Sequence, residues 1–324
     1  MHTPSETSRR RTLSVVAQVA FAGCLALAGC RSGVHVDGSG GGSPSDGSST
    51  VSTANSAAST ASGGAWPTPD LQCHPLPEEH AVFAPLFSQY SGVFGVHLFA
   101  TAATPCPKLQ HAAGVMAQYL DNDENGTPDD PLVLQAMLEV NAALVMFATE
   151  QELENSDPGR IFGAPYALQD LFGTETHPEG STAESGFDAT LEEVLHLISD
   201  KGHARAYPAR LGLDIGTDLS EAMDIARGGQ FTSVPSRYPP EAWYHYDDVS
   251  CDYGSMATEY FYWSLTSILG AQSYAGRPEW IADEWELYNE QLVKTTDVAV
   301  YALMTDPALK LPTALPDGKY APSP

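Results

Sequence analysis

The segment 190–198 contains three side chains that can bind a metal ion or transfer a proton: Glu192, Glu193 and His196. The apolar residues around them recur at the helical spacing i, i+3, i+4 and i+7, namely Leu191, Val194, Leu195 and Ile198. Residues three and four positions apart share a helix face, so the two carboxylates and the imidazole are predicted to lie together on the opposite face. Zinc accepts carboxylate oxygen as well as imidazole nitrogen, and this spacing therefore indicates a divalent metal site.

Glu259 is a further candidate ligand, because it stands in a segment, 256–269, that has almost no polar side as a helix. A carboxylate on such a buried helix must be paired, protonated or bound to metal. The string EExxH resembles the HExxH helix of the zincin metallopeptidases with its first histidine replaced by Glu192. In glutamate-type zincins a later helix supplies a third, glutamate ligand. The resemblance implies that Glu192, His196 and Glu259 bind zinc or another divalent metal, with Glu193 as the catalytic general base.

Purely structural explanations of the same residues stay open. Thr190 and Glu193 have the spacing of a capping box, which would leave Glu192 and His196 as an ordinary exposed pair. Glu259 can equally be a buried carboxylate that accepts hydrogen bonds from tyrosine hydroxyls or an arginine. His111, within a helix predicted over 108–120, is either another ligand or a core histidine.

A second group of metal-binding residue types follows that helix. The sequence DNDENGTPDD, from Asp121 to Asp130, places oxygen donors at alternate positions and a glycine at the sixth. It resembles the first half of an EF-hand loop, which implies calcium binding by Asp121, Asp123 and Asn125. Leu132 replaces the glutamate of the twelfth position, so a distant acid would have to complete the site. The alternative is an Asn-Gly turn whose last aspartates cap the next helix.

The elements that carry these residues predict an α+β, helix-rich single globular domain over 66–324. Buried strands are expected over 91–100 and 143–149. Helices are expected over 108–120, from Pro131 with Asp130 as its cap, and over 150–154, 188–201, 218–227, 256–269 and 278–293. The acidic run 283–286 is predicted to be a solvent-exposed face of the last helix. Cys73 and Cys106 are the expected disulfide, with Cys251 left over, although other pairings are possible.

The first 30 residues have the pattern of an export signal. Three arginines, 9–11, precede a short apolar stretch that ends in Leu27-Ala28-Gly29-Cys30. This resembles the lipobox of a bacterial lipoprotein signal peptide, which implies removal of residues 1–29 and attachment of acyl chains to Cys30. An ordinary secretory signal, a second lipobox-like match ending at Cys24 and a twin-arginine signal are the alternatives. Residues 30–65 comprise the lipidated cysteine and a Ser/Gly-rich tether that is predicted to be disordered.

Charge and hydropathy limit the possible partners. The chain has 41 Asp and Glu against 15 Lys and Arg, a net charge of −26, which argues against a nucleic-acid-binding protein. No apolar stretch reaches the ~20 residues of a membrane-spanning helix, so the lipid is the expected membrane contact. Arg31 after the lipobox cysteine resembles the outer-membrane sorting pattern, which implies a place in the cell envelope, on either its periplasmic or its outer face.

Two functions are consistent with these observations. The first is a membrane-anchored lipoprotein with a non-catalytic ectodomain, stabilised by calcium and a disulfide, that binds a protein or peptide partner. The alternative is a divergent zincin-like, metal-dependent peptidase or hydrolase. The two differ in whether Glu192, His196 and Glu259 converge in the folded chain.

Overall fold

Regular structure follows directly on the Ser/Gly-rich segment. The computed structural model describes residues 66–157 and 165–322. Cys30 and the rest of the predicted signal and tether lie outside the described residues, so the lipid anchor stays a prediction. None of the helices within the described ranges is long and apolar enough to cross a membrane.

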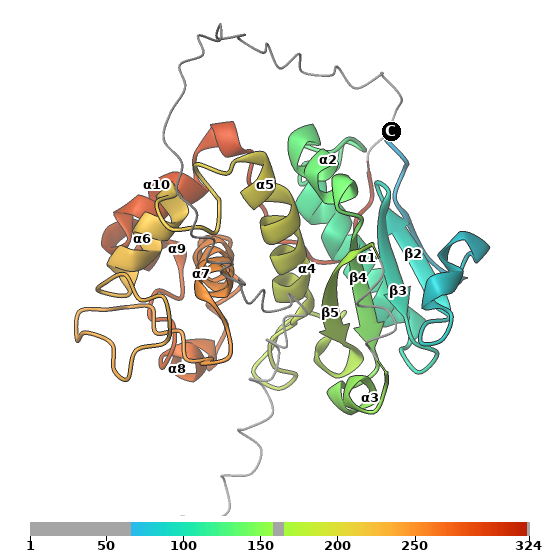
Figure 1. Ribbon diagram of the computed structural model, residues 1–324, viewed down its shortest axis with the longest axis horizontal. Coiled ribbons are helices and arrows are strands. Elements are labelled where there is room, and N and C mark those ends of the chain that lie inside the picture. Colours follow the sequence, from blue (N-terminus) through green and yellow to red (C-terminus); the bar gives the residue numbers. More distant parts are fainter. Residues whose placement is uncertain (1–65, 158–164, 323–324) are drawn as a thin grey trace, which may run out of the picture.

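A five-stranded mixed sheet, in the order β1-β2-β3-β4-β5, forms one half of the molecule (Figure 1). The strands are β1 (Asp70–Pro75), β2 (Gln89–Val93), β3 (Val96–Ala100), β4 (Ala142–Phe147) and β5 (Ala167–Phe172). The first three are antiparallel neighbours, and β3, β4 and β5 are parallel. The parallel step from β3 to β4 is made by two crossover helices, α1 (Cys106–Leu120) and α2 (Pro131–Glu139).

The single strand predicted over 91–100 is instead a hairpin. Phe94 and Gly95 have φ values of 52° and 93°, which form the tight turn between β2 and β3. The prediction was wrong because the turn has no polar residue, so the apolar run continues from Val93 through Phe94 and Gly95 to Val96. Gly95 was the visible signal of the reversal.

The alternation of side chains along the strands separates two apolar layers. Leu98, Leu144 and Leu171 belong to the main core beneath the large helices. Phe99, Val145, Phe147 and Phe172 point to the opposite face, where they pack with residues of two short elements, η1 (Glu78–Phe83) and α3 (Glu150–Glu154). The sheet is thus covered on both faces, as its continuous apolar strands require.

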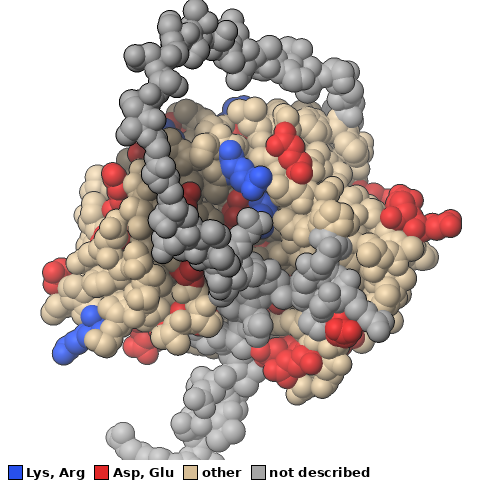
Figure 2. Space-filling model, viewed as in Figure 1, with Lys and Arg blue, Asp and Glu red and all other residues tan. Residues whose placement is uncertain are grey.

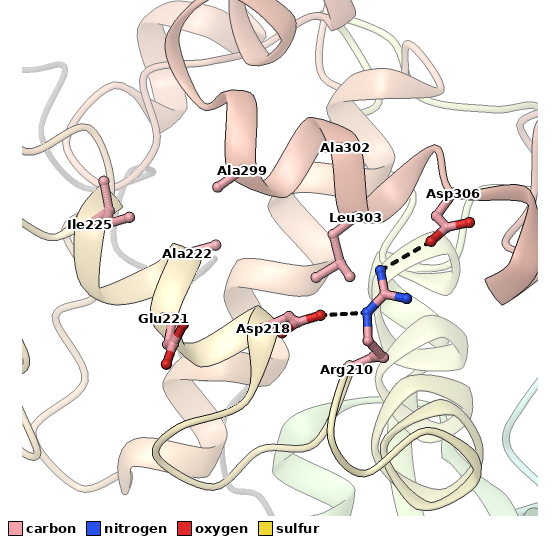
Figure 3. Close-up of a pocket in the computed structure, with 9 residues that line it drawn as sticks. All are labelled: Arg210, Asp218, Glu221, Ala222, Ile225, Ala299, Ala302, Leu303 and Asp306. Atoms are coloured by element: carbon pink, nitrogen blue, oxygen red, sulfur yellow. Dashed lines mark hydrogen bonds and ion pairs between the residues drawn. The ribbon is translucent and has the colours of Figure 1, made fainter.

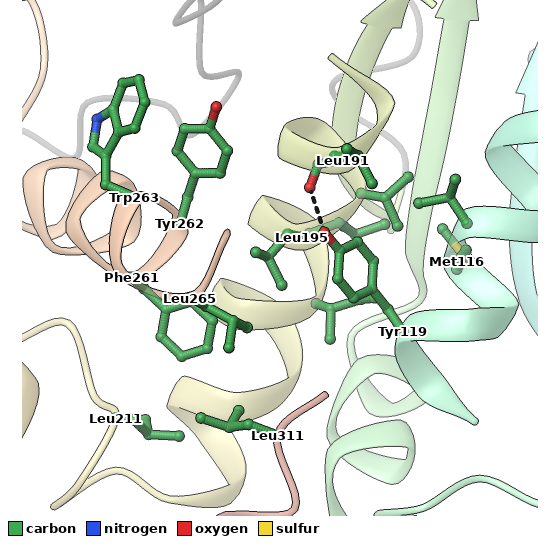
Figure 4. Packing of buried hydrophobic residues seen from close by; sticks show 14 of the residues in the cluster. Met116, Tyr119, Leu191, Leu195, Leu211, Phe261, Tyr262, Trp263, Leu265 and Leu311 are labelled. Carbon is green, nitrogen blue, oxygen red and sulfur yellow. Dashed lines mark hydrogen bonds between the residues drawn. The ribbon is translucent and has the colours of Figure 1, made fainter. Parts of the chain in front are cut away.

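Helix α4 (Thr190–Ile198) lies between the sheet and the helices of the C-terminal half (Figure 1). It contacts β4, β5 and α1 on one side and α7 on the other. Figure 4 shows Leu195 of α4 between Tyr119 of α1 and Phe261 of α7, and the Leu191 carbonyl accepting a hydrogen bond from the Tyr119 hydroxyl. The C-terminal helices are α6 (Asp218–Ala226), α7 (Tyr253–Ile268), α8 (Arg277–Ile281), α9 (Glu290–Thr296) and α10 (Val298–Met304).

Two helix predictions need correction. The helix expected over 188–201 ends at Ile198 and continues as a single π-helical turn, Ser199–His203, before the short α5 (Ala204–Ala206). The helix expected over 278–293 is divided into α8 and α9. Between them Trp285 is fully buried, and the backbone of 284–286 hydrogen-bonds to that of 243–245 instead of continuing a helix.

Cys73 of β1 and Cys106, the first residue of α1, form a disulfide with a Cα–Cα distance of 5.7 Å. This bond joins the edge of the sheet to the helix that packs on it. The carboxyl-terminal segment returns from α10 to the same region, where the backbone N–H groups of Asp317 and Gly318 donate to Gln118 of α1. The two halves of the molecule are therefore tied together at α1 as well as at α4.

Candidate metal centre

The N-terminus of α4 is not capped in the way that the capping box predicts. Thr190 is the first helical residue rather than the cap, and its Oγ1 has no hydrogen-bond partner in the part of the chain that the structure describes. Asp188 performs this role instead, since its Oδ1 accepts from the backbone N–H groups of His177 and Thr190. Its other oxygen, Oδ2, lies 2.7 Å from Nε2 of His111, which places His111 in this pair and not among the metal-binding candidates.

The two candidate helices bring His196 between two carboxylates. Nδ1 of His196 lies 3.6 Å from Oε2 of Glu193, one turn earlier on α4, and Nε2 lies 3.4 Å from Oε1 of Glu259 on α7. All three side chains are buried, with exposed fractions of 5% for Glu193 and His196 and 7% for Glu259. Glu192 joins them, because ligand atoms of Glu192, Glu193 and His196 all lie within 4.8 Å of one another. Glu259 is not in that group of three and reaches it through its 3.4 Å contact with His196, so the predicted residues are neighbours, with His196 in contact with both helices' carboxylates.

One pair of donor atoms, His196 Nε2 and Glu259 Oε1, has the spacing of two ligands of one divalent ion. Two ligand atoms at about 2.1 Å from a tetrahedral zinc ion are about 3.4 Å apart, which is the separation of His196 Nε2 and Glu259 Oε1. Nε2 is also buried without a hydrogen-bond partner of acceptable geometry among the described residues. Its contact with the Glu259 carboxylate offsets part of the cost of burying this nitrogen, and a metal ion between the two atoms would satisfy both. The donor set, two carboxylates and one imidazole, fits zinc and also harder divalent metals.

Electrostatics of the cluster is dominated by negative charge inside the protein. Burial raises the pKa of Glu192 to about 7, and the Glu259 carboxylate adds to this, while His196, Arg277 and a hydrogen bond from Tyr262 oppose it. Burial raises the pKa of Glu193 well above its usual range, despite the hydrogen bond and charge of His196. Burial alone would lower the pKa of His196, but the two carboxylates outweigh it and raise that pKa well above its ordinary value. Protons or a cation must therefore compensate these carboxylates.

Several residues of the cluster were not predicted from the sequence. Gln169 of β5 donates from Nε2 to Glu193 Oε2 at 2.7 Å. The Tyr262 hydroxyl, in hydrogen-bond contact with Glu192, itself accepts from Gln272 at 3.0 Å and from Arg277 at 3.3 Å. Each of the α4 carboxylates is thus held by a polar group from a different element. The one available signal was the tyrosine one turn after Glu259 on an otherwise apolar helix.

Glu284 is a third buried carboxylate near the cluster, beside Glu193 and Glu259, with an exposed fraction of 6%, whereas Glu192 is half-buried. Its Oε1 accepts from Trp263 Nε1 at 3.2 Å. Burial and the charge of Glu259 raise the pKa of Glu284 well above its usual range. The prediction that the run 283–286 is a solvent-exposed helix face was wrong for this residue, because the segment pairs with 243–245 and carries Glu284 inward.

The Asp-rich loop brings together part of the predicted calcium site. Oxygens of Asp121, Asp123 and Asp129 lie within 4.8 Å of one another. Asn125 instead forms hydrogen bonds within the loop, from Nδ2 to Asp123 and from Thr127 N–H to its Oδ1. Asp121 is fully buried and accepts from the backbone of Asn125 and Gly126 and from the Tyr320 hydroxyl. The loop therefore also anchors the carboxyl-terminal segment to α1.

A surface groove of about 430 Å³ lies between α6 and α10 (Figure 3). Arg210 lies at one end of it, with ion pairs to Asp218 and, at 3.0 Å, to Asp306. The groove shares no residue with the α4–α7 cluster.

Acidic side chains are scattered over the face shown in Figure 2, with few basic ones between them. No family model, curated protein or solved structure matches this chain, so any function rests on the site itself.

Proposed function

We propose that this protein is a metal-dependent hydrolase whose divalent ion is bound by Glu192, His196 and Glu259, and that it is held at the cell envelope by acyl chains on Cys30. The observation that carries the proposal is the approach of His196 Nε2 to Glu259 Oε1, at 3.4 Å, from two separate helices. That distance is the one expected between two ligands of a single tetrahedral ion.

The charge of the cluster supports the same conclusion. Glu192, Glu193 and Glu259 lie around one histidine, Glu284 adds a further negative charge that acts on Glu259 and Glu192, and Arg277 is the other cation that acts on Glu192. A bound divalent ion compensates such a group of carboxylates without requiring each to take up a proton. When bound, it would also supply a water molecule ionised near neutral pH and polarise the bond to be hydrolysed. The resemblance of EExxH to the zincin helix suggests a peptide as substrate.

Metal analysis of the full chain, purified without chelator, tests this proposal. We expect about one equivalent of zinc or another divalent metal in the wild type and loss of that metal in His196→Ala. His74→Ala is the matched control, because His74 is exposed and pairs with Asp70 on β1 at 2.9 Å, outside the cluster. Equal metal content in wild type and His196→Ala would contradict the proposal.

A second candidate function is the non-catalytic, calcium-stabilised binding domain. The close oxygens of Asp121, Asp123 and Asp129 favour a calcium ion at that loop. Calcium there would strengthen the attachment of the carboxyl-terminal segment through Asp121 and Tyr320, and it would act on stability rather than on catalysis. The two proposals concern different sites, so a calcium effect on stability leaves the metal analysis of the α4–α7 cluster unaffected.

A further inference from the structure

The carboxylate of Glu193 faces the side of the His196 ring that is turned away from Glu259. Its Oε2 lies 3.6 Å from Nδ1, whereas Glu259 approaches Nε2 on the opposite edge of the ring. An imidazole that binds a metal through one nitrogen carries its proton on the other, and the partner of that N–H selects the tautomer. Glu193 therefore occupies the place from which the ring can be oriented.

A second residue holds Glu193 in that place. Gln169 donates from Nε2 to the same oxygen, Oε2, at 2.7 Å. Gln169 lies on β5, two residues before Leu171, so both side chains point toward the main core and α4. Because β5 is fixed by its register with β4, the carboxylate is fixed by the sheet as well as by its own helix.

We propose that Glu193, fixed by Gln169, is a positioning residue that attracts the Nδ1–H of His196, from 3.6 Å in this structure, and so presents Nε2 as a metal ligand. This rests on the proposed function, since it assumes that His196 binds the ion. It assigns Glu193 a different role from the general base that the zincin resemblance implies. A general base must reach the metal-bound water, whereas a positioning residue must reach Nδ1.

The affinity of the full chain for zinc, measured by competition with a chromogenic chelator, separates the two roles. Loss of a carboxylate that orients a histidine ligand weakens metal binding by roughly 10–100-fold. We expect this loss in Glu193→Ala and a smaller one in Glu193→Gln, because the amide oxygen still accepts from Nδ1–H. Gln169→Ala should weaken binding by less than Glu193→Ala. Glu221→Ala, an exposed residue in the first turn of α6, is the control and should bind as the wild type does.

A spectroscopic measurement on the zinc-loaded wild type requires no variant of the site. Long-range proton–nitrogen NMR of the His196 ring should report a proton on Nδ1 and metal on Nε2. Metal on Nδ1, or wild-type affinity in both Glu193→Ala and Glu193→Gln, would overturn the positioning role. Hydrolysis lost in Glu193→Gln with zinc affinity unchanged would overturn it in favour of the general base. Failure of the wild type to bind zinc or any other divalent metal would instead refute the proposed function, so the two failures are distinguishable.

Discussion

Glu192→Gln is expected to stabilise the metal-free protein at neutral pH although it removes a metal ligand. Burial, with the neighbouring Glu259 carboxylate, raises the pKa of Glu192 from 4.5 to about 7. Between these two values the folded chain binds more protons than the unfolded chain. The free energy of unfolding therefore falls as the pH rises from about 4.5 to about 7, and this loss is complete above the folded-state pKa.

The size of the effect follows from the same shift. Raising a pKa from 4.5 to about 7 corresponds to about 3 kcal/mol of unfolding free energy at pH 7.5, and to about 1 kcal/mol at pH 5. Glutamine stays neutral at both values and its amide oxygen can still accept from Tyr262. Glu192→Gln should therefore be more stable than the wild type by about 3 kcal/mol at pH 7.5 and by about 1 kcal/mol at pH 5.

Urea denaturation of EDTA-treated protein at the two pH values measures this difference. Glu221→Gln is the matched control, because Glu221 is also in the first turn of a nine-residue helix but is exposed. Added zinc should raise the urea midpoint of the wild type and leave that of Glu192→Gln unchanged. A variant that is no more stable than the wild type at pH 7.5, or that gains equally at both pH values, would refute the desolvation argument.

Two other predictions concern the Asp-rich loop and the predicted anchor. Millimolar calcium should raise the melting temperature of the wild type above its value in EGTA, because a ligand that binds only the native state stabilises it, and Asp121→Asn should abolish the difference. Identical melting curves in calcium and EGTA would reduce the loop to a structural turn. Cys30→Ser should release the chain from the membrane fraction or block its processing, measured by fractionation and mass spectrometry. A processed variant that stays membrane-bound as the wild type does would exclude lipidation at Cys30.

The fold class and many of its helices could be predicted because their signals are local. Asp130 accepts from the Leu132 N–H at 3.0 Å and precedes Pro131, as the cap pattern required. α7 is rich in apolar residues and buried along most of its length because α4, α6, α9 and α10 all contact it. The division of the sequence 278–293 into two helices was not predictable in this way. It depends on pairing with 243–245, and no local propensity encodes a contact over that separation.

The candidate site shows the same limit. The spacing of Glu192, Glu193 and His196 on one helix predicted that they would share a face, and the apolar surroundings of Glu259 indicated that it was buried. Gln169, Tyr262 and Glu284 were not predicted, because their positions depend on how the sheet, α7 and the 283–286 segment pack against α4. A glutamine on a strand or an acid in a polar run carries no local sign of such a contact.

The Asp-rich loop and the carboxylates of the α4–α7 cluster differ in how far contacts within the fold account for them. In the Asp-rich loop, both oxygens of Asp121 accept hydrogen bonds from backbone N–H groups or a tyrosine hydroxyl. Its role in attaching the carboxyl-terminal segment is therefore enough to account for this buried aspartate. At α4, burial raises the pKa values of Glu192 and Glu193, which means that ionising these two carboxylates costs stability, and the charge of His196, whose pKa the carboxylates raise, opposes that cost. Hydrogen bonds within the fold thus explain the loop, whereas the α4 carboxylates need a compensating cation. A bound divalent ion would turn the unfavourable contribution of the ionised carboxylates to folding stability into a favourable one. This is the physical argument for looking for metal at α4 first.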